Sequence, residues 1–567
     1  MRFANRIIIF NFFAAIALLA GGSLMAQSGN LLTLSSWNNR AIVNTAYGSV
    51  KGISDKGNTW CWRGIPYATP PVGSLRWKAP TDPAPWTGIR NASKFASPAS
   101  QLLPRLGPMG SEDCLHLNIW RPKNEESRLP VYVFIHGGGN SIGTGNSRDY
   151  YGHAVAGESK MVYVTVNFRL GVMGWFRHPA VTGSGTPEDQ SGNFGTLDLI
   201  KALQWIHKNI EAFGGDPGNV TIAGESGGAF DVLSLLTSPL AKGLFHRAVC
   251  ESAINMIYST KQAEEQTVKL VKNLLIADGK ATDDVNADQI YRGMGDREID
   301  NYLRSKSPVE IMKRIPVIFG VMAEWRSIYT DGVVLPSKGY GVFADGSWAN
   351  KVPLIIGVNK NEATLFNLLL KKDAPGTRDY ELLSRYQSLL WRVCGLDTIA
   401  SAMVSNPGSP PVYAYRFDWG SPDDSGMSVL PKEMGARMGA NHYAEIPFFL
   451  GMRKNQLAMI TGKTYTTKNL PGREKLTKLS LSYLSNFART GNPNRNGLPN
   501  WEPWNPSHGA NKFIILDAGF NDLRISHGSE NLSVKMVIDL IKTELQEPEQ
   551  SNILRKLYAP LPFGLGK

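Results

Sequence analysis

One ten-residue segment constrains the fold of this chain more than any other: residues 220–229, which read VTIAGESGGA. The segment joins a short apolar strand to a G-x-S-x-G turn and to small residues that start a helix. Glycines flank Ser226, and a Cβ on either side would crowd so sharp a turn. The segment predicts a strand–turn–helix unit that presents Ser226 to a base and to hydrogen-bond donors. A plain glycine-rich turn has the same pattern, so the rest of the chain must distinguish the two.

Composition indicates one large globular unit. The 567 residues are 42% hydrophobic, which supplies a sizeable core and excludes a disordered chain. No linker, charge block or internal repeat divides the sequence. We therefore expect one catalytic domain over residues 27–567.

The first 26 residues have the pattern of a secretory signal peptide. A positive start with Arg2 and Arg6 precedes an apolar run over 7–19, and small residues lead to a cleavage position after Ala26. The apolar run is shorter than the ~20 residues of a membrane-spanning helix, and no later segment is long enough. We expect a signal peptide at 1–26 and a secreted or periplasmic protein without a stable membrane span; an uncleaved anchor is the alternative.

Charge and motif content exclude several partner classes. The net charge is +12, and it falls to +10 once the signal peptide leaves, because Arg2 and Arg6 go and no acid does. The basic residues are spread along the chain without a nucleic-acid motif, which indicates a solvated surface rather than a nucleic-acid partner. No cluster of His, Cys and carboxylates has metal-ligand spacing, and no cofactor motif occurs. We expect no metal and no cofactor, and the oligomeric state stays unknown.

A second glycine-rich motif lies upstream. The apolar run 130–135 predicts a buried strand, and His136 and three successive glycines follow it. Such a loop can direct several backbone N–H groups into one cavity, where they stabilise an oxyanion. An H-G-G-G loop ahead of a G-x-S-x-G turn is the arrangement of α/β-hydrolases.

Strands and helices alternate around these two motifs. Residues 161–166 form a buried strand, and 197–211 carry apolar residues at helical spacing before the strand of 220–225. This alternation predicts the α/β-hydrolase fold: a central, mostly parallel twisted sheet with helices on both faces. Ser226 would then lie at the carboxyl end of a central strand, where open sheets bind their ligands.

The base must follow Ser226, because the triad of this fold runs serine, acid, histidine. Of the four candidates, His246 is too close to leave room for a further strand and an acid. His508 and His527 fall in polar segments typical of surface loops. His442 lies in a small-residue loop that leads into an apolar segment, so elimination favours His442.

Two acids follow predicted strands between the serine and the histidine. Residues 352–358 lead to Glu362, and 412–417 lead to Asp418. The first strand is continuously apolar, as a doubly buried parallel strand should be, whereas the second alternates more and is typical of the flank of a sheet. We therefore favour Glu362 over Asp418.

Together these motifs resemble the type B carboxylesterase and cholinesterase family. The resemblance extends from about Tyr47 to Leu516, with ordered matches at 64–68, 70–73, 112–120, 167–171, 192–195, 213–217 and 489–494. It implies that Ser226, Glu362 and His442 form a catalytic triad and that the N–H groups of Gly138, Gly139 and Gly227 form the oxyanion hole. Glu225, beside the serine, and Glu445, after the histidine, further match acidic positions that surround the triad in the family.

The resemblance implies a secreted serine carboxylesterase that acts on a small-molecule ester through an acyl-enzyme. A lipase, an amidase or a carbamate hydrolase would use the same triad. A non-catalytic binding protein of the cholinesterase type would lack triad residues, and all three are present here.

Two departures from the family limit what the resemblance implies. Relatives often close a surface loop with a disulfide at the position of Cys114, but 97–100 contain no cysteine, so either Cys61 is the partner or Cys114 is free. Cholinesterases place a tryptophan in the same loop to bind quaternary ammonium, whereas 94–113 contain only Phe95 as an aromatic. Choline esters are therefore not expected as substrates.

Overall fold

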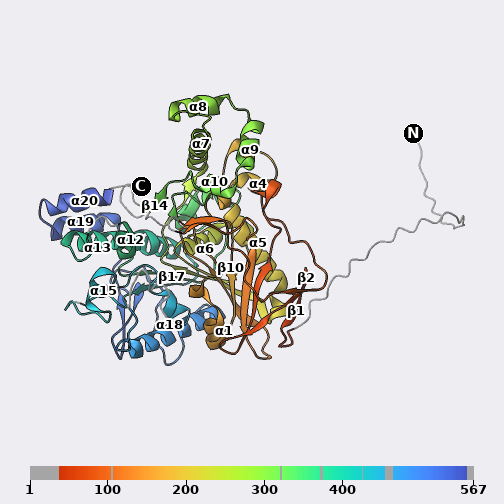
Figure 1. Ribbon diagram of the computed structural model, residues 1–567. Coiled ribbons are helices and arrows are strands. Elements are labelled where there is room, and N and C mark those ends of the chain that lie inside the picture. Colours follow the sequence, from red (N-terminus) through yellow and green to blue (C-terminus); the bar gives the residue numbers. More distant parts are fainter. Residues whose placement is uncertain are drawn as a thin grey trace, which may run out of the picture.

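The computed structural model describes residues 37–103, 106–318, 322–370, 374–423, 425–453 and 464–558. The signal-peptide prediction for 1–26 lies outside these residues. An eleven-stranded sheet runs through the molecule (Figure 1), in the order β20-β19-β18-β17-β12-β11-β9-β10-β8-β4-β3. In chain order its strands are β3 (Ile53–Asp55), β4 (Thr59–Pro66), β8 (His116–Pro122), β9 (Leu129–Ile135), β10 (Val162–Val166), β11 (Gly215–Glu225), β12 (Arg247–Glu251), β17 (Leu354–Asn359), β18 (Val412–Phe417), β19 (Phe513–Ala518) and β20 (Leu523–Gly528).

The centre of the sheet is parallel and its two margins are antiparallel. All neighbours from β10 through β9, β11, β12, β17 and β18 to β19 pair in parallel, and the other pairs are antiparallel. Strands β9, β10 and β17 are buried along their whole length, because helices cover both faces. The predicted mostly parallel sheet is confirmed.

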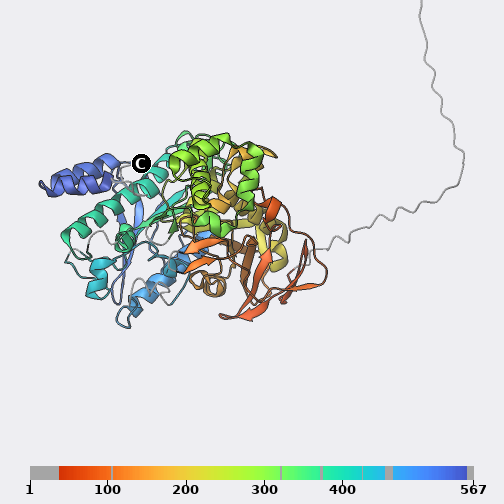
Figure 2. The ribbon, with the colours of Figure 1, turned by 45° about the horizontal axis from the view of Figure 1, so that its top comes forward.

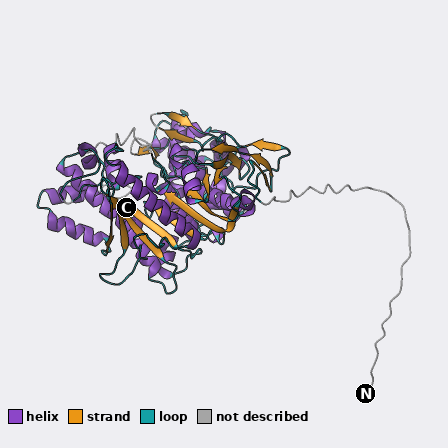
Figure 3. Cartoon of the chain, turned by 90° about the horizontal axis from the view of Figure 1, so that it is seen from below, coloured by secondary structure: helices purple, strands orange, loops and turns teal. Residues whose placement is uncertain are grey.

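Helices flank the sheet on both sides (Figure 3). One core contains apolar residues of α5 (Phe194–Asn209) and α6 (Gly227–Thr237), and the core on the opposite face contains residues of α18 (Leu470–Thr490). The helix expected at 197–211 is α5, which begins three residues earlier than expected. A 3-10 turn continues it over Ile210–Phe213. Within the described residues, the other helices of seven or more residues are α1 (His153–Ser159), α7 (Thr260–Ala277), α8 (Asp284–Gly293), α9 (Asp296–Ser305), α12 (Ala363–Leu370), α13 (Arg378–Arg392), α14 (Thr398–Val404), α19 (Val534–Glu544) and α20 (Glu549–Tyr558).

Helices α19 and α20 form a small core of their own with α13, built from leucine, isoleucine and valine side chains and from Tyr386. They lie at the edge of the molecule in two views (Figures 1 and 2). Helices α7 to α9 lie above the sheet in Figure 1. A three-stranded sheet of β1 (Ile42–Thr45), β2 (Gly48–Lys51) and β5 (Ile89–Asn91) completes the amino-terminal part.

Two sequence expectations are corrected, and the open alternative for Cys114 is decided. Strand β18 is not a flank, because β19 and β20 lie beyond it. His527 lies on the exposed strand β20 rather than in a loop. Cys61 and Cys114 carry free thiols, since their side chains belong to the cores on opposite faces of the sheet.

Candidate active site

Ser226 occupies a strained turn between β11 and α6. Its backbone angles are φ 55° and ψ −119°, a region that non-glycine residues avoid and that surrounding contacts must hold. A Cβ at Gly224 would lie 2.4 Å from the carbonyl carbon of Gly228, and one at Gly228 would lie 2.1 Å from the Ile135 oxygen. The turn therefore needs glycine at both positions. Ser226 is half-buried between fully buried neighbours, so its hydroxyl remains reachable.

The glycine loop after β9 lies directly against this turn. Gly138 and Gly139 have φ values of 112° and 59°, in the region that favours glycine. A Cβ at Gly227 would lie 2.8 Å from the amide nitrogens of both Gly139 and Asn140. Within the described part of the chain, the N–H groups of Gly138, Gly139 and Gly227 donate no hydrogen bond. Uncommitted donors therefore gather beside Ser226 at the amino end of α6, whose dipole also favours a negative charge.

His442 is brought to this place by a buried loop and is held by Glu362. The Nδ1 atom of His442 lies 2.6 Å from Glu362 Oε2, and the backbone N–H of Asn359 donates a hydrogen bond to Glu362 Oε1 at 2.7 Å. The rings of Phe366 and Trp391 pack against the imidazole at 5.0 and 4.9 Å. A neutral His442 with its proton on Nδ1 would therefore leave Nε2 as the basic atom.

A second carboxylate faces the other ring nitrogen. Glu225 Oε1 lies 3.1 Å from His442 Nε2. Among the contacts of the described residues, no hydrogen bond joins Ser226 to His442, and Glu225 Oε1 has no hydrogen-bond partner. Burial raises the pKa of Glu225 and would by itself lower the pKa of His442, but the carboxylates of Glu225 and Glu362 outweigh burial and raise the pKa of His442.

Glu445 supports the site from behind. Burial raises its pKa to about 7, and its Oε1 accepts a hydrogen bond from Ser252 Oγ at 2.8 Å. The Asn359 side chain donates to Glu445 Oε2 and, at 2.8 Å, to the Asn441 carbonyl beside the histidine. Sequence reasoning missed Ser252 and Asn359. Both lie where a buried parallel strand ends, β12 and β17, and that position was the available signal.

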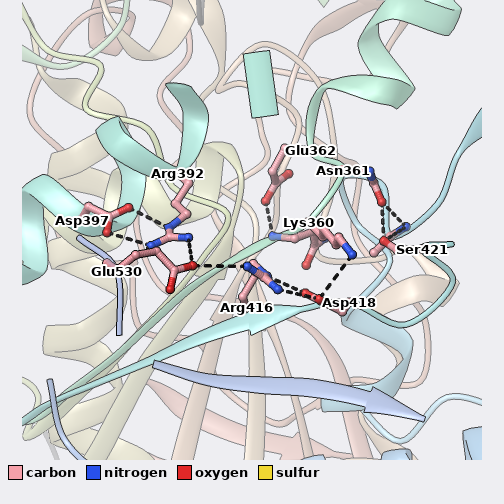
Figure 4. A network of polar contacts seen from close by, with 11 residues as sticks. Lys360, Asn361, Glu362, Arg392, Asp397, Arg416, Asp418, Ser421 and Glu530 are labelled. Carbon is pink, nitrogen blue, oxygen red and sulfur yellow. Dashed lines mark hydrogen bonds and ion pairs between the residues drawn. The ribbon is translucent and has the colours of Figure 1, made fainter. Parts of the chain in front are cut away.

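Asp418, the alternative acid, is committed elsewhere. Its carboxylate accepts two hydrogen bonds from Arg416, at 2.7 and 2.8 Å, and lies 3.8 Å from Lys360 Nζ. Figure 4 shows Asp418 turned toward these cations, away from Glu362. The structure thus brings Glu362, Glu225 and His442 together beside Ser226, and leaves Asp418 outside the group.

Within the described ranges, no three His, Cys, Asp or Glu side chains form a group that could hold a metal ion. In the same ranges, none of the helices combines the length and apolar character needed to cross a membrane.

Comparisons with known proteins agree with this architecture. A model of the carboxylesterase family matches residues 39–391 and 373–526. The para-nitrobenzyl esterase of Bacillus subtilis (strain 168) is 31% identical over 527 residues, which cover 84% of this chain and 95% of that protein. Carboxylesterase 1D of Rattus norvegicus is 30% identical, covering 82% of this chain and 88% of that protein.

Solved structures give the same result. A PNB esterase aligns with a TM-score of 0.67 at 28% identity, over 86% of this chain and 98% of that chain. A carboxylesterase of Geobacillus stearothermophilus aligns with a TM-score of 0.67 at 29% identity, over the same shares. The chain therefore belongs to the carboxylesterase family, has the α/β-hydrolase fold, and is a carboxylic ester hydrolase.

Proposed function

We propose that the chain hydrolyses carboxylic esters with Ser226 as nucleophile, His442 as general base and Glu362 as the acid that orients the imidazole. The observation that carries the proposal is the 2.6 Å contact between Glu362 and His442 beside the strained turn at Ser226. Such a contact fixes the tautomer of the histidine and stabilises the imidazolium that forms during attack.

The steps follow from these roles. The imidazole Nε2 of His442 takes the Ser226 proton while Oγ attacks the ester carbonyl carbon. The N–H groups of Gly138, Gly139 and Gly227 receive the oxyanion, and each lost donor would cost ~10²–10³-fold in kcat. The imidazolium protonates the departing alcohol, leaving an acyl-serine. Water activated by the same imidazole then releases the carboxylic acid.

The substrate class is tested with a panel of small esters. Para-nitrobenzyl esters are the first choice, given the name of the Bacillus subtilis relative. We expect turnover of simple aryl and benzyl esters and little turnover of the matched amides, because an amine leaves less readily than an alcohol. Faster turnover of triacylglycerol, amide or carbamate would favour a lipase, amidase or carbamate hydrolase.

Glu225 is expected to set the acidic limb of the pH profile. The Glu225 carboxylate stabilises the imidazolium, and attack needs neutral imidazole, so kcat/KM rises as pH rises through the pKa of His442. Glu225→Gln removes this charge and lowers that pKa. The acidic limb should therefore shift to lower pH.

A matched control lies on the neighbouring strand. Glu251 is in register with Glu225, and burial raises its pKa well above the usual range. The carboxylates that raise the pKa of His442 are Glu225, Glu362 and Glu445, so Glu251→Gln should leave the limb in place. An unmoved limb in Glu225→Gln, or equal shifts in both variants, would contradict this role for Glu225.

We also propose that the protein is exported after cleavage near Ala26. Terminal sequencing of the secreted form should begin within a few residues of Gln27. Recovery of the full-length chain in the cytoplasm would contradict export.

A further inference from the structure

A buried polar pair joins the glycine loop to the helix that follows Ser226. Asn140 comes directly after Gly139, and its Nδ2 donates to Asp231 Oδ1 on α6 at 3.1 Å and more weakly to Ser327 Oγ at 3.4 Å. The Asn140 side chain is 2% exposed and Asp231 is fully buried. The residue after the oxyanion loop is thus tied to the helix that carries the nucleophile at its amino end.

Each side chain of the pair has one oxygen left over. Asn140 Oδ1 and Asp231 Oδ2 are buried, and neither has a partner among the described residues. A buried polar atom without a partner destabilises the folded protein, because its lost contact with water is not replaced. An ionised carboxylate offers only acceptors, so it could not satisfy the amide oxygen. A protonated Asp231 has an O–H donor, which is the group that the amide oxygen lacks.

Among the described residues, no cation forms an ion pair with Asp231. The elements packed against α6 are β9, β11, β12, α5 and the 3-10 turn Gly339–Gly341. Asp198 of α5 is bound to Arg169, and strand alternation directs Glu225 and Glu251 to the opposite face of the sheet. The titratable groups on this side are His136, the Cys250 thiol and the Tyr340 hydroxyl; burial lowers the pKa of His136 to about 4 and raises the pKa of the other two. The arginine beside Ser327, Arg326, is exposed to solvent.

We propose that Asp231 is a neutral acid that forms a two-bond acid–amide pair with Asn140 and so holds the oxyanion loop against the Ser226 helix. In this pair Asn140 Nδ2–H donates to Asp231 Oδ1, and Asp231 Oδ2–H donates to Asn140 Oδ1. Asp231 is a positioning residue, and its effect on catalysis rests on the proposed role of the loop and Ser226. Burial raises the pKa of Asp231 well above its usual range, which agrees with the proton the pair requires.

The Asp231→Asn substitution distinguishes a neutral Asp231 from an ionised one, because an asparagine side chain offers one donor and one acceptor, as the neutral acid does. Asp231→Asn should preserve both bonds and keep most of kcat on a para-nitrobenzyl ester. Asp231→Ala and Asn140→Ala should each lower kcat ~10–100-fold with KM little changed, because the loop donors lose their alignment. The exchanged variant Asn140→Asp/Asp231→Asn rebuilds the pair and should recover kcat. Ser234→Ala, three residues along α6, is the control for a general weakening of the helix.

Thermal unfolding tests the proton without using activity. Above pH ~4 the unfolded Asp231 ionises while the folded one stays neutral, so wild type loses stability relative to Asp231→Asn as pH rises toward the folded pKa. The Tm of Asp231→Asn minus that of wild type should therefore grow between pH 4.5 and pH 8. A constant difference, or a kcat for Asp231→Asn as low as for Asp231→Ala, would overturn the proposal. Ester turnover by Ser226→Ala would instead refute the proposed function and leave the Tm result standing.

Discussion

Ser226→Ala is expected to lose roughly 10⁶-fold in kcat, because the remaining site has no nucleophile and triad members act as a unit. The strained turn holds a half-buried hydroxyl beside uncommitted N–H groups. A fluorophosphonate probe should label one residue of the wild type stoichiometrically and none in the variant, since attack on phosphorus needs an activated serine and an oxyanion site. Intact-mass spectrometry measures the labelling, and ester kinetics measure the loss in kcat.

His442→Ala should lose labelling as well, and the double variant Ser226→Ala/His442→Ala should be scarcely slower than either single one. The serine variant should keep the wild-type Tm within a few degrees, because one hydroxyl is lost at a strained turn rather than from the core. Labelling at another residue, or turnover that survives purification of Ser226→Ala, would refute the mechanism while leaving the fold unchanged.

Glu362→Gln is the second large effect, and we expect a loss of ~10⁴ in kcat. Glu362 is fully buried and lies 2.6 Å from His442 Nδ1, so the amide would lose stabilisation of the imidazolium and permit the wrong tautomer. Far-ultraviolet circular dichroism should show the same fold. Steady-state kinetics on one ester then isolates the catalytic loss.

Asp418→Asn is the matched control, since Asp418 follows the neighbouring parallel strand but pairs with Arg416. It should keep most activity, with a modest fall in Tm from the weakened ion pair. If the two variants exchanged behaviour, the acid would be Asp418 and the proposed role of Glu362 would be wrong.

Local patterns were sufficient to predict most of the scaffold. The apolar runs at 130–135, 161–166 and 352–358 became buried parallel strands, because a strand covered on both faces needs continuous hydrophobicity. The turn at Ser226 was also predictable, because a side chain at position 224 would clash with the backbone of Gly228 and one at position 228 with the backbone of Ile135.

Contacts between segments that lie far apart in the chain were harder to predict from the sequence. Strand β18 alternates enough in sequence to be taken for a flank, yet β19 and β20 arrive from a hundred residues later and cover it. The sequence left open whether Cys61 pairs with Cys114, because the face that the Cys61 side chain occupies depends on the register of β4 in the assembled sheet.

The sequence by itself determined the fold class, the elbow and the glycine loop, because each depends on residues close together in the chain. Only the tertiary structure decided which carboxylates surround His442 and which polar group anchors the loop. Glu225 lies on β11, Glu362 follows β17 and Asp231 lies on α6, and these positions converge through sheet order and helix packing. Such contacts leave no periodic pattern in the sequence. The raised pKa of His442 and the proposed proton on Asp231 therefore depend on the folded protein.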